Sequence, residues 1–242
     1  MENILYGCLR GCPAGSPPNG VDGVGGWFHP RLASLCISFG LTAMKREILG
    51  LALAGGKGRR MGRDKAMLSF HGGQTQLDYT LALLGTFCSK VAISGPEEQR
   101  SCRKKESEAA FIPDEAGVSG PMSGVIAGLR NEESWPVLVM ACDLPLVDGS
   151  LVLRLLSQRN SQKRATCFVA LDGRPEPLLA IYEASALKEL RVCAEKGMFS
   201  LRRFLEEADV EKVSCREPHL IASVNTLEDL ERVREQLTRS KE

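Results

Sequence analysis

The sequence predicts an α/β fold in which a mostly parallel sheet is covered by helices on both faces, giving three layers in a single domain. Short apolar runs, typical of strands that are buried on both sides, alternate along the chain with segments of helical periodicity. This alternation starts near residue 44 and reaches the C-terminus without an internal repeat or a low-complexity tract. Strands and helices that alternate in this way form parallel sheets, because each helix returns the chain to the start of the next strand.

Eight short apolar runs, bounded by turn-forming or charged residues, are predicted as strands. In chain order they are Ile48–Ala54, Lys90–Ser94, Ala110–Pro113, Pro136–Cys142, Ala165–Ala170, Leu178–Tyr182, Lys212–Cys215 and Leu220–Val224. In open α/β sheets, ligands bind outside the carboxyl ends of the strands. The residues that follow these runs are therefore the first candidates for a functional site.

Six segments with apolar residues three or four positions apart are predicted as helices. They are Gln76–Cys88, Pro121–Leu129, Ser150–Gln158, Ala184–Glu195, Ser200–Glu207 and Leu227–Leu237. Pro121 suits the first turn of its helix, where the backbone N–H that proline lacks has no helical partner. The last helix has the clearest pattern, because Thr226 can cap it and Asp229 stands three residues later, as in a capping box.

Residues 1–43 differ from the rest of the chain. They hold eight glycines and four prolines and show neither helical nor strand periodicity. Such a segment buries too little apolar surface to offset the loss of chain entropy. We expect it to be a disordered extension, or the product of a start mis-assigned to Met1 in place of Met44, and we expect residues 44–242 to form the domain.

The overall composition excludes several classes of partner. A net charge of +1 over 242 residues gives no broad basic surface, so neither nucleic acid nor a membrane surface is an expected partner. No apolar stretch approaches the roughly 18 to 20 residues that span a bilayer. The nine cysteines include no Cys-x-x-Cys pair and stand mostly in apolar runs, so we expect reduced thiols in a cytoplasmic protein.

The run LALAGGKGRRMGRDKAML, at residues 51–68, begins inside the first predicted strand and holds four glycines and five cationic side chains. Glycines let backbone N–H groups approach an anion, and arginine and lysine donate charged hydrogen bonds to phosphate oxygens. Neither a Walker A loop nor a Gly-x-Gly-x-x-Gly dinucleotide fingerprint fits the spacing. The run therefore predicts a phosphate site of another kind, with a solvated basic loop as the alternative.

Asp143 follows the apolar run at 136–142. An ionised carboxylate is costly to bury unpaired, which makes aspartate a poor packing residue at the end of a central strand. Coordination of Mg²⁺ beside substrate phosphates removes that cost, since Mg²⁺ is usually held by one or two carboxylates together with phosphate oxygens. The alternative interpretation is an N-cap or turn aspartate.

Three other places carry weaker signals. Asp114 follows the run at 110–113 and precedes a glycine-rich segment, for which a plain loop is the alternative. The segment Arg174–Leu178 precedes a predicted strand. Asn225 joins the last predicted strand to the last helix, where a turn or capping residue is the simpler interpretation.

Together these features resemble the molybdenum cofactor guanylyltransferases, which are MobA-like nucleotidyltransferases. The resemblance covers about residues 48–237 and rests on five elements in order: Leu53-Ala54-Gly55-Gly56-x-x-x-Arg60-Met61-Gly62-x-Asp64-Lys65, Gly120-Pro121-Met122-Ser123-Gly124, Cys142-Asp143-Leu144-Pro145, Glu176-Pro177-Leu178 and Val224-Asn225-Thr226-x-Glu228-Asp229-Leu230. The first element is shared with other nucleotidyltransferases, cytidylyltransferases included. The double glycine and the late Val-Asn-Thr element favour the guanylyl branch.

The resemblance implies a Rossmann-like nucleotidyltransferase fold and a Mg²⁺-dependent reaction. GTP and molybdenum-loaded molybdopterin would give the guanine dinucleotide form of the cofactor and pyrophosphate, and the product would pass to molybdoenzymes or insertion factors. The nucleotide-binding residues would be Leu53, Ala54, Gly55, Gly56, Lys65, Asp114 and Asp143. The catalytic residues would be Arg60, Lys65 and Asp143, with Asp143 as the metal ligand. The acceptor would contact Pro177 and Asn225.

Two residues depart from the family pattern. Ser94 and Ser223 stand where the family often has asparagine, at positions where base or acceptor contacts are expected. A cytidylyltransferase for the same cofactor, or for another phosphorylated acceptor, is therefore an alternative, and a non-catalytic nucleotide-binding module is a second. The reaction needs no strong general base, because an acceptor phosphate is already ionised at neutral pH. The three histidines, His29, His71 and His219, accordingly stand at no predicted site position.

Overall fold

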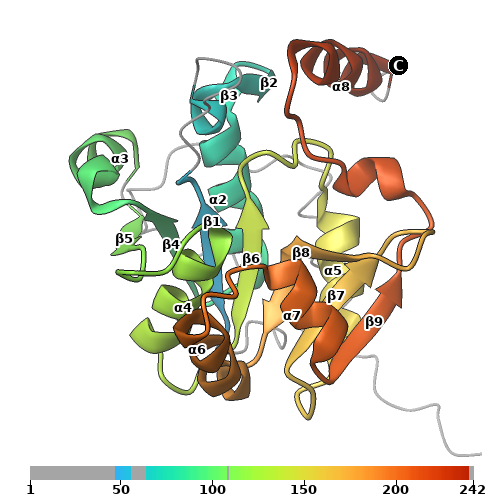
Figure 1. The fold of residues 1–242 in the computed structure, drawn as a ribbon. Helices are drawn as coiled ribbons and strands as arrows, with labels where there is room; N and C mark the ends of the chain where they lie inside the picture. The colour runs from blue at the N-terminus through green and yellow to red at the C-terminus, as the bar shows by residue number, and fades with distance from the viewer. Residues whose placement is uncertain (1–46, 56–63, 108, 240–242) are drawn as a thin grey trace, which may run out of the picture.

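A computed structural model describes residues 47–55, 64–107 and 109–239. Their main element is a seven-stranded sheet of order β5–β4–β1–β6–β8–β7–β9 (Figure 1). Its strands are β1 (Leu49–Leu53), β4 (Lys90–Gly95), β5 (Ala110–Pro113), β6 (Val137–Ala141), β7 (Ala165–Val169), β8 (Pro175–Tyr182) and β9 (Val210–Ser214). A separate two-stranded ribbon consists of β2 (Ser69–His71) and β3 (Gln74–Thr75). The segment 1–43, expected to be an extension, lies outside the described residues.

Helices connect the strands and cover both faces of the sheet. They are α2 (Gln76–Phe87), α3 (Arg100–Glu106), α4 (Pro121–Asn131), α5 (Gly149–Ser157), α6 (Leu187–Glu195), α7 (Leu201–Glu207) and α8 (Leu227–Arg239). Helices α2 and α5 pack on one face, and α4, α6 and α7 pack on the other. The predicted three-layer α/β fold in a single domain is confirmed.

One strand of the sheet is reversed. β1 is parallel to β4 and β6, β4 is parallel to β5, and β7 is parallel to β9. β8 runs antiparallel to its neighbours β6 and β7. Because Leu179 pairs with Met140 and Tyr182 pairs with Val137, the start of β8 lies at the edge where β6 ends.

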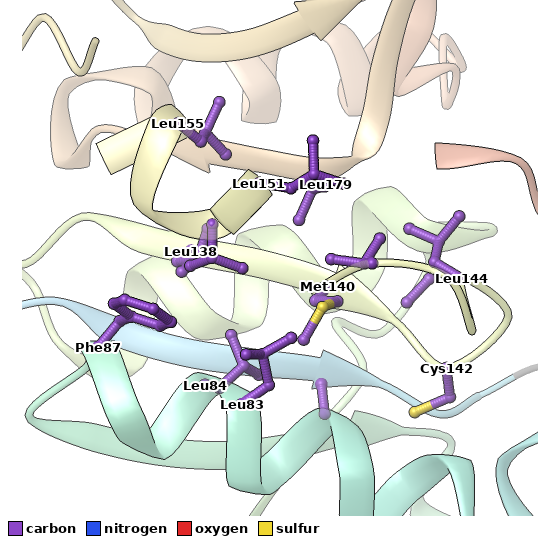
Figure 2. Close-up of a cluster of buried hydrophobic side chains, with 14 of the residues drawn as sticks. Leu83, Leu84, Phe87, Leu138, Met140, Cys142, Leu144, Leu151, Leu155 and Leu179 are labelled. Atoms are coloured by element: carbon purple, nitrogen blue, oxygen red, sulfur yellow. The ribbon is translucent and has the colours of Figure 1, made fainter. Parts of the chain in front are cut away.

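Two hydrophobic clusters hold the layers together, one on each face of the sheet. Successive residues of β6 alternate between them: Leu138 and Met140 belong to the cluster with α2 and α5, and Val137 and Val139 belong to the cluster with α4. Figure 2 shows leucines of α2 and α5 meeting the side chains of β6 in the first cluster. Burying each leucine or valine side chain contributes about 1.5–3 kcal/mol to the free energy of unfolding. These two clusters therefore hold the ends of the strands firmly in place.

The predicted strand at 220–224 is wrong. Pro218–Ile221 forms a 3₁₀ turn, and no sheet partner is present among the described strands for the residues that follow. Ile221 and Val224 are nevertheless buried. A short apolar run can bury its side chains as a strand or as a turn, so its hydrophobicity alone does not tell the two apart. The backbone N–H of Val224 donates to the carbonyl of Asp143 at 2.9 Å. This contact brings the segment before α8 to the end of β6.

Helix α3 and the β2–β3 ribbon were not predicted, because α3 is short and polar and the ribbon strands have two or three residues each. None of the helices in the described part of the chain combines the length and apolarity that a bilayer crossing needs.

Candidate active site

A cavity of about 830 Å³ lies at the carboxyl edge of the parallel strands. Its walls come from the residues that end or follow β1, β4, β5 and β6, from the start of α4, from β8 and from the segment before α8. The chain passes from β1 to β4 on one side and later returns to β6 on the other, so the cavity lies at a topological switch point. Its volume suits a small-molecule ligand.

Most of the predicted site residues meet in this cavity. Those that line it are Leu53, Ala54, Gly55, Lys65, Asp114, Asp143 and Asn225. Gly56 and Arg60 lie outside the described residues. Pro177 is buried and is not among the described lining residues; its carbonyl accepts a hydrogen bond from the Tyr182 hydroxyl at 3.0 Å. Its neighbour Leu178 lines the cavity instead, because successive residues of a strand face opposite sides.

Lys65 lies between two oxygen acceptors. Its Nζ donates to Asn225 Oδ1 at 2.8 Å and lies 3.5 Å from Asp143 Oδ2. Asn225 presents its oxygen to Lys65 because its Nδ2 donates to Ser223 Oγ at 2.8 Å. The backbone N–H of Asn225 donates to Asp229 at the start of α8. An ammonium has three N–H donors, so Lys65 can bind an anion in addition to these two contacts.

Asp143 has the properties expected of a metal ligand. Burial raises the pKa of its carboxyl above the ordinary value, and the Lys65 ammonium opposes that shift. Its Oδ1 atom is buried and has no hydrogen-bond partner among the described residues. A buried carboxylate oxygen without a partner is costly, and a cation bound to it removes that cost. Since Mg²⁺ prefers carboxylate oxygens, Asp143 fits the predicted ligand.

Asp114 belongs to the part of the wall formed by β4 and β5. The hydroxyl of Ser94, which is 1% exposed, donates to Asp114 Oδ1 at 2.9 Å. Burial raises the pKa of the Asp114 carboxyl, while hydrogen bonds from Ser94 and Ser123 oppose the shift. Ser94, one of the departures from the family pattern, thus orients this carboxylate.

Two glycines let the walls of the cavity approach one another. A Cβ atom at Gly55 would lie 3.4 Å from Asp114 Oδ2. A Cβ atom at Gly124, on α4, would lie 2.8 Å from both Leu53 Cδ2 and Ser94 Oγ. A side chain at Gly124 would therefore displace residues that line the cavity.

An ion pair between a buried arginine and an exposed aspartate lies beside the cavity and was not predicted. Arg103 of α3 donates through Nη2 to Asp64 Oδ2 at 2.6 Å. Asp64 stands in the glycine-rich motif, but no apolar periodicity marks the polar helix that carries Arg103. Its position behind the site follows from the fold and has no signal in the sequence.

The family model described as the MobA-like NTP transferase domain matches residues 50–213. The chain belongs to the MobA-like NTP transferase family. The matched residues run from β1 into β9 and include Lys65, Asp114 and Asp143, whereas Asn225 lies beyond them.

Two relatives of this MobA-like chain have names that refer to the molybdenum cofactor. It is 33% identical to the molybdenum cofactor guanylyltransferase of Serratia proteamaculans over 190 residues, which are 77% of this chain and 93% of that protein. It is 32% identical to the molybdenum cofactor biosynthesis bifunctional protein of Synechocystis sp. over 183 residues, which are 75% of this chain. The chain spans about half of that second relative, 52% of its length.

Solved structures share the MobA-like fold. The molybdopterin-guanine dinucleotide biosynthesis protein A of Archaeoglobus fulgidus is 26% identical with a TM-score of 0.68, and the match covers 79% of this chain and 99% of that one. The 2-C-methyl-D-erythritol 4-phosphate cytidylyltransferase of Thermus thermophilus is 20% identical with a TM-score of 0.56, covering 80% of this chain and 100% of that one. The second likeness is one of fold alone.

Proposed function

We propose that this protein is a molybdenum cofactor guanylyltransferase, which transfers GMP from GTP to molybdenum-loaded molybdopterin and releases pyrophosphate. The observation that carries the proposal is the meeting of Lys65, Asp143 and Asn225 at one end of the cavity, from segments as much as 160 residues apart. The names of the similar proteins support the choice of nucleotide and acceptor.

The reaction is an in-line displacement at the α-phosphorus of GTP. A phosphate oxygen of the acceptor forms the new bond to phosphorus, and the bond from phosphorus to the oxygen bridging the α- and β-phosphates breaks. Since the acceptor phosphate is already ionised at neutral pH, the protein acts by positioning and by charge neutralisation. Lys65 donates to the phosphates, and Arg60, which lies outside the described residues, is proposed to share this role.

Mg²⁺ is the proposed cofactor, and Asp143 is the residue that would hold it. The ion would neutralise charge on the phosphates as the pyrophosphate leaves. The buried, unpartnered Oδ1 of Asp143 supports this assignment. Lys65, 3.5 Å from the other carboxylate oxygen, keeps the carboxylate charged and oriented while the nucleotide binds.

Asp114 supports GTP over CTP. The Watson–Crick edge of guanine presents two neighbouring donors, the ring N–H and the exocyclic amino group, whereas that of cytosine presents one amino donor beside two acceptors. An ionised carboxylate accepts hydrogen bonds and cannot donate them. We propose that Asp114, which Ser94 orients and which lines the cavity, contacts the base, where a carboxylate matches guanine better than cytosine.

Asn225 is the residue proposed to contact molybdopterin, the acceptor of the GMP group. It binds Lys65 and lines the cavity, as Leu178 does. Pro177, the other residue proposed for the acceptor, is buried in β8 next to Leu178 and is not among the described residues that line the cavity. We further propose a cytoplasmic reaction whose product passes to molybdoenzymes or insertion factors.

Pyrophosphate release tests the proposal. Purified protein with Mg²⁺ and molybdenum-loaded molybdopterin is given GTP, CTP or ATP in parallel. We expect release with GTP at a rate at least ten times that with CTP. Preference for CTP would make the protein a cytidylyltransferase, and nucleotide binding without release in any reaction would make it a binding module.

A further inference from the structure

Arg103, on α3, is a buried charged side chain that the proposed reaction does not use. It is 1% exposed, and it is not among the described residues that line the cavity. Removing a guanidinium from water costs free energy unless its charge and donors are matched by nearby acceptors. Its partners therefore show what it contributes.

The Arg103 guanidinium connects two chain segments beside the cavity, the end of β1 and the turn that contains Lys65. Arg103 Nη2 donates to the carbonyl oxygen of Ala54 at 3.1 Å and to Asp64 Oδ2 at 2.6 Å. Ala54 follows β1, and Asp64 comes directly before Lys65. One side chain thus links the end of β1 to the residue that precedes the phosphate-binding lysine.

The other oxygen of Asp64 orders the turn that carries Lys65. Asp64 Oδ1 accepts the backbone N–H of Ala66 at 3.0 Å and caps the 3₁₀ turn Lys65–Met67. A carboxylate held at both oxygens cannot rotate without breaking one of the two contacts. The backbone of Lys65 is therefore located relative to β1 through Asp64 and Arg103.

We propose that Arg103 is a positioning residue for Lys65, and this rests on the proposed role of Lys65 in binding phosphate. Arg103 acts through Asp64: it fixes the Lys65–Met67 turn against the end of β1, so that the ammonium of Lys65 meets both Asp143 and the phosphates of the nucleotide.

A double-mutant cycle tests this role. Arg103→Lys keeps the positive charge, but the side chain is one atom shorter and cannot reach both acceptors in the same geometry. We expect it to lower kcat/KM for GTP by about 10-fold or more in the wild-type background and by less than about 3-fold in a Lys65→Ala background. A purely structural role would lower kcat/KM by the same factor in both backgrounds and would overturn the proposal.

Two further variants serve as a substitute for Arg103→Lys and as its control. Asp64→Asn keeps an oxygen that can cap the turn and removes the charge that pairs with Arg103, so it replaces Arg103→Lys in the cycle if that variant does not fold. Arg203→Lys is the matched control, since Arg203 is exposed on α7 and pairs with Glu207 at 2.7 Å, far along the chain from the site. We expect the control to stay within about 2-fold of wild type.

The affinity for inorganic pyrophosphate, measured by titration calorimetry, separates this proposal from the proposed function. If wild type releases no pyrophosphate from GTP, the guanylyltransferase assignment fails, and the same cycle is run on this affinity. Non-additive losses in Arg103→Lys and Lys65→Ala would still support the positioning role. Additive losses, or an affinity that Lys65→Ala leaves unchanged, would overturn it.

Discussion

At the residue scale, the burial of the Asp143 carboxylate costs free energy, and the same carboxylate is the proposed Mg²⁺ ligand. Asp143→Asn preserves its shape and removes its charge. We expect pyrophosphate release to fall about 100-fold, because the charge that would hold Mg²⁺ is lost. We expect the thermal unfolding midpoint to stay the same or to rise, because a buried carboxylate whose pKa is raised by burial has been neutralised. Steady-state kinetics and calorimetry measure the two effects. More than a tenth of wild-type activity in the variant would exclude Asp143 as the main metal ligand.

Asp114 makes a prediction about pH. Burial holds the pKa of its carboxyl above the ordinary value of 3.8, so the folded protein binds a proton more tightly than the unfolded chain at this position. Its contribution to stability is therefore fully present below pH 3.8 and is lost as the pH rises through the folded pKa. We expect Asp114→Asn to gain stability relative to wild type as the pH rises over this range. Urea unfolding at pH 3.5 and pH 7 measures the difference, and an equal or opposite difference at pH 7 would contradict the expectation.

At the scale of the element, α2 and α4 each contain a glycine whose replacement tests how closely the helix packs. Gly124→Ala puts a Cβ 2.8 Å from Leu53 and Ser94, whereas a Cβ at Gly85 in α2 meets nothing within 4 Å. We expect Gly124→Ala to weaken GTP binding about 10-fold and to lower stability by about 1 kcal/mol. Gly85→Ala is the matched control and should raise stability by up to about 1 kcal/mol through helix propensity. Calorimetric unfolding and GTP titration check both variants.

Most elements were predictable because their signal is local. Seven of the eight predicted strands are confirmed, since an apolar run such as Val137–Ala141 must be buried on both faces whichever neighbours it acquires. The eighth run, at 220–224, is buried without joining the sheet. Helix α3 has no comparable signal, because its polar residues give it little apolar periodicity. It was therefore easier to predict which residues are buried than to predict which segments pair as strands of the sheet.

At the scale of the whole molecule, α8 stabilises the site from outside the main core. Leu230 and Val233 of α8 form a small cluster with Val224, against which Leu68 and Phe70 pack, so the helix lies beside the β2–β3 ribbon (Figure 1). We expect Leu230→Ala to weaken the docking of α8 by about 2 kcal/mol and to reduce activity, because Asp229 of α8 holds the backbone of Asn225.

Hydrogen exchange tests this expectation for Leu230→Ala. The amides of α8 should exchange faster, while those of the central strands β1 and β6 stay protected, since they belong to the two large clusters. Glu235→Ala, on the exposed side of the same helix, should leave exchange and activity unchanged. Equal loss of protection in β1 and α8 would mean that the helix unfolds only with the whole domain.

The candidate site was predictable where it follows directly from strand ends. Lys65, Asp114 and Asp143 meet in the cavity because parallel strands end at one edge, and the motif order pointed to them. The position of Arg103 beside the site depends on an unpredicted helix, and it was not predictable. The motif Glu176-Pro177-Leu178 was identified, but the place of Leu178 in the cavity lining depends on the reversal of β8. Both positions depend on tertiary contacts, which a local sequence pattern does not encode.

The hydrogen bond between Lys65 and Asn225 has a consequence for the growing chain. The two residues are 160 positions apart, and Asn225 follows the last strand of the sheet, β9, in the chain. During translation, the sheet strands from β1 to β9 are all synthesised before Asn225, so they can begin to assemble while the amide that binds Lys65 does not yet exist. A nascent chain that has not yet reached Asn225 therefore lacks the complete polar cluster, and the site is finished only after every strand of the sheet has been made.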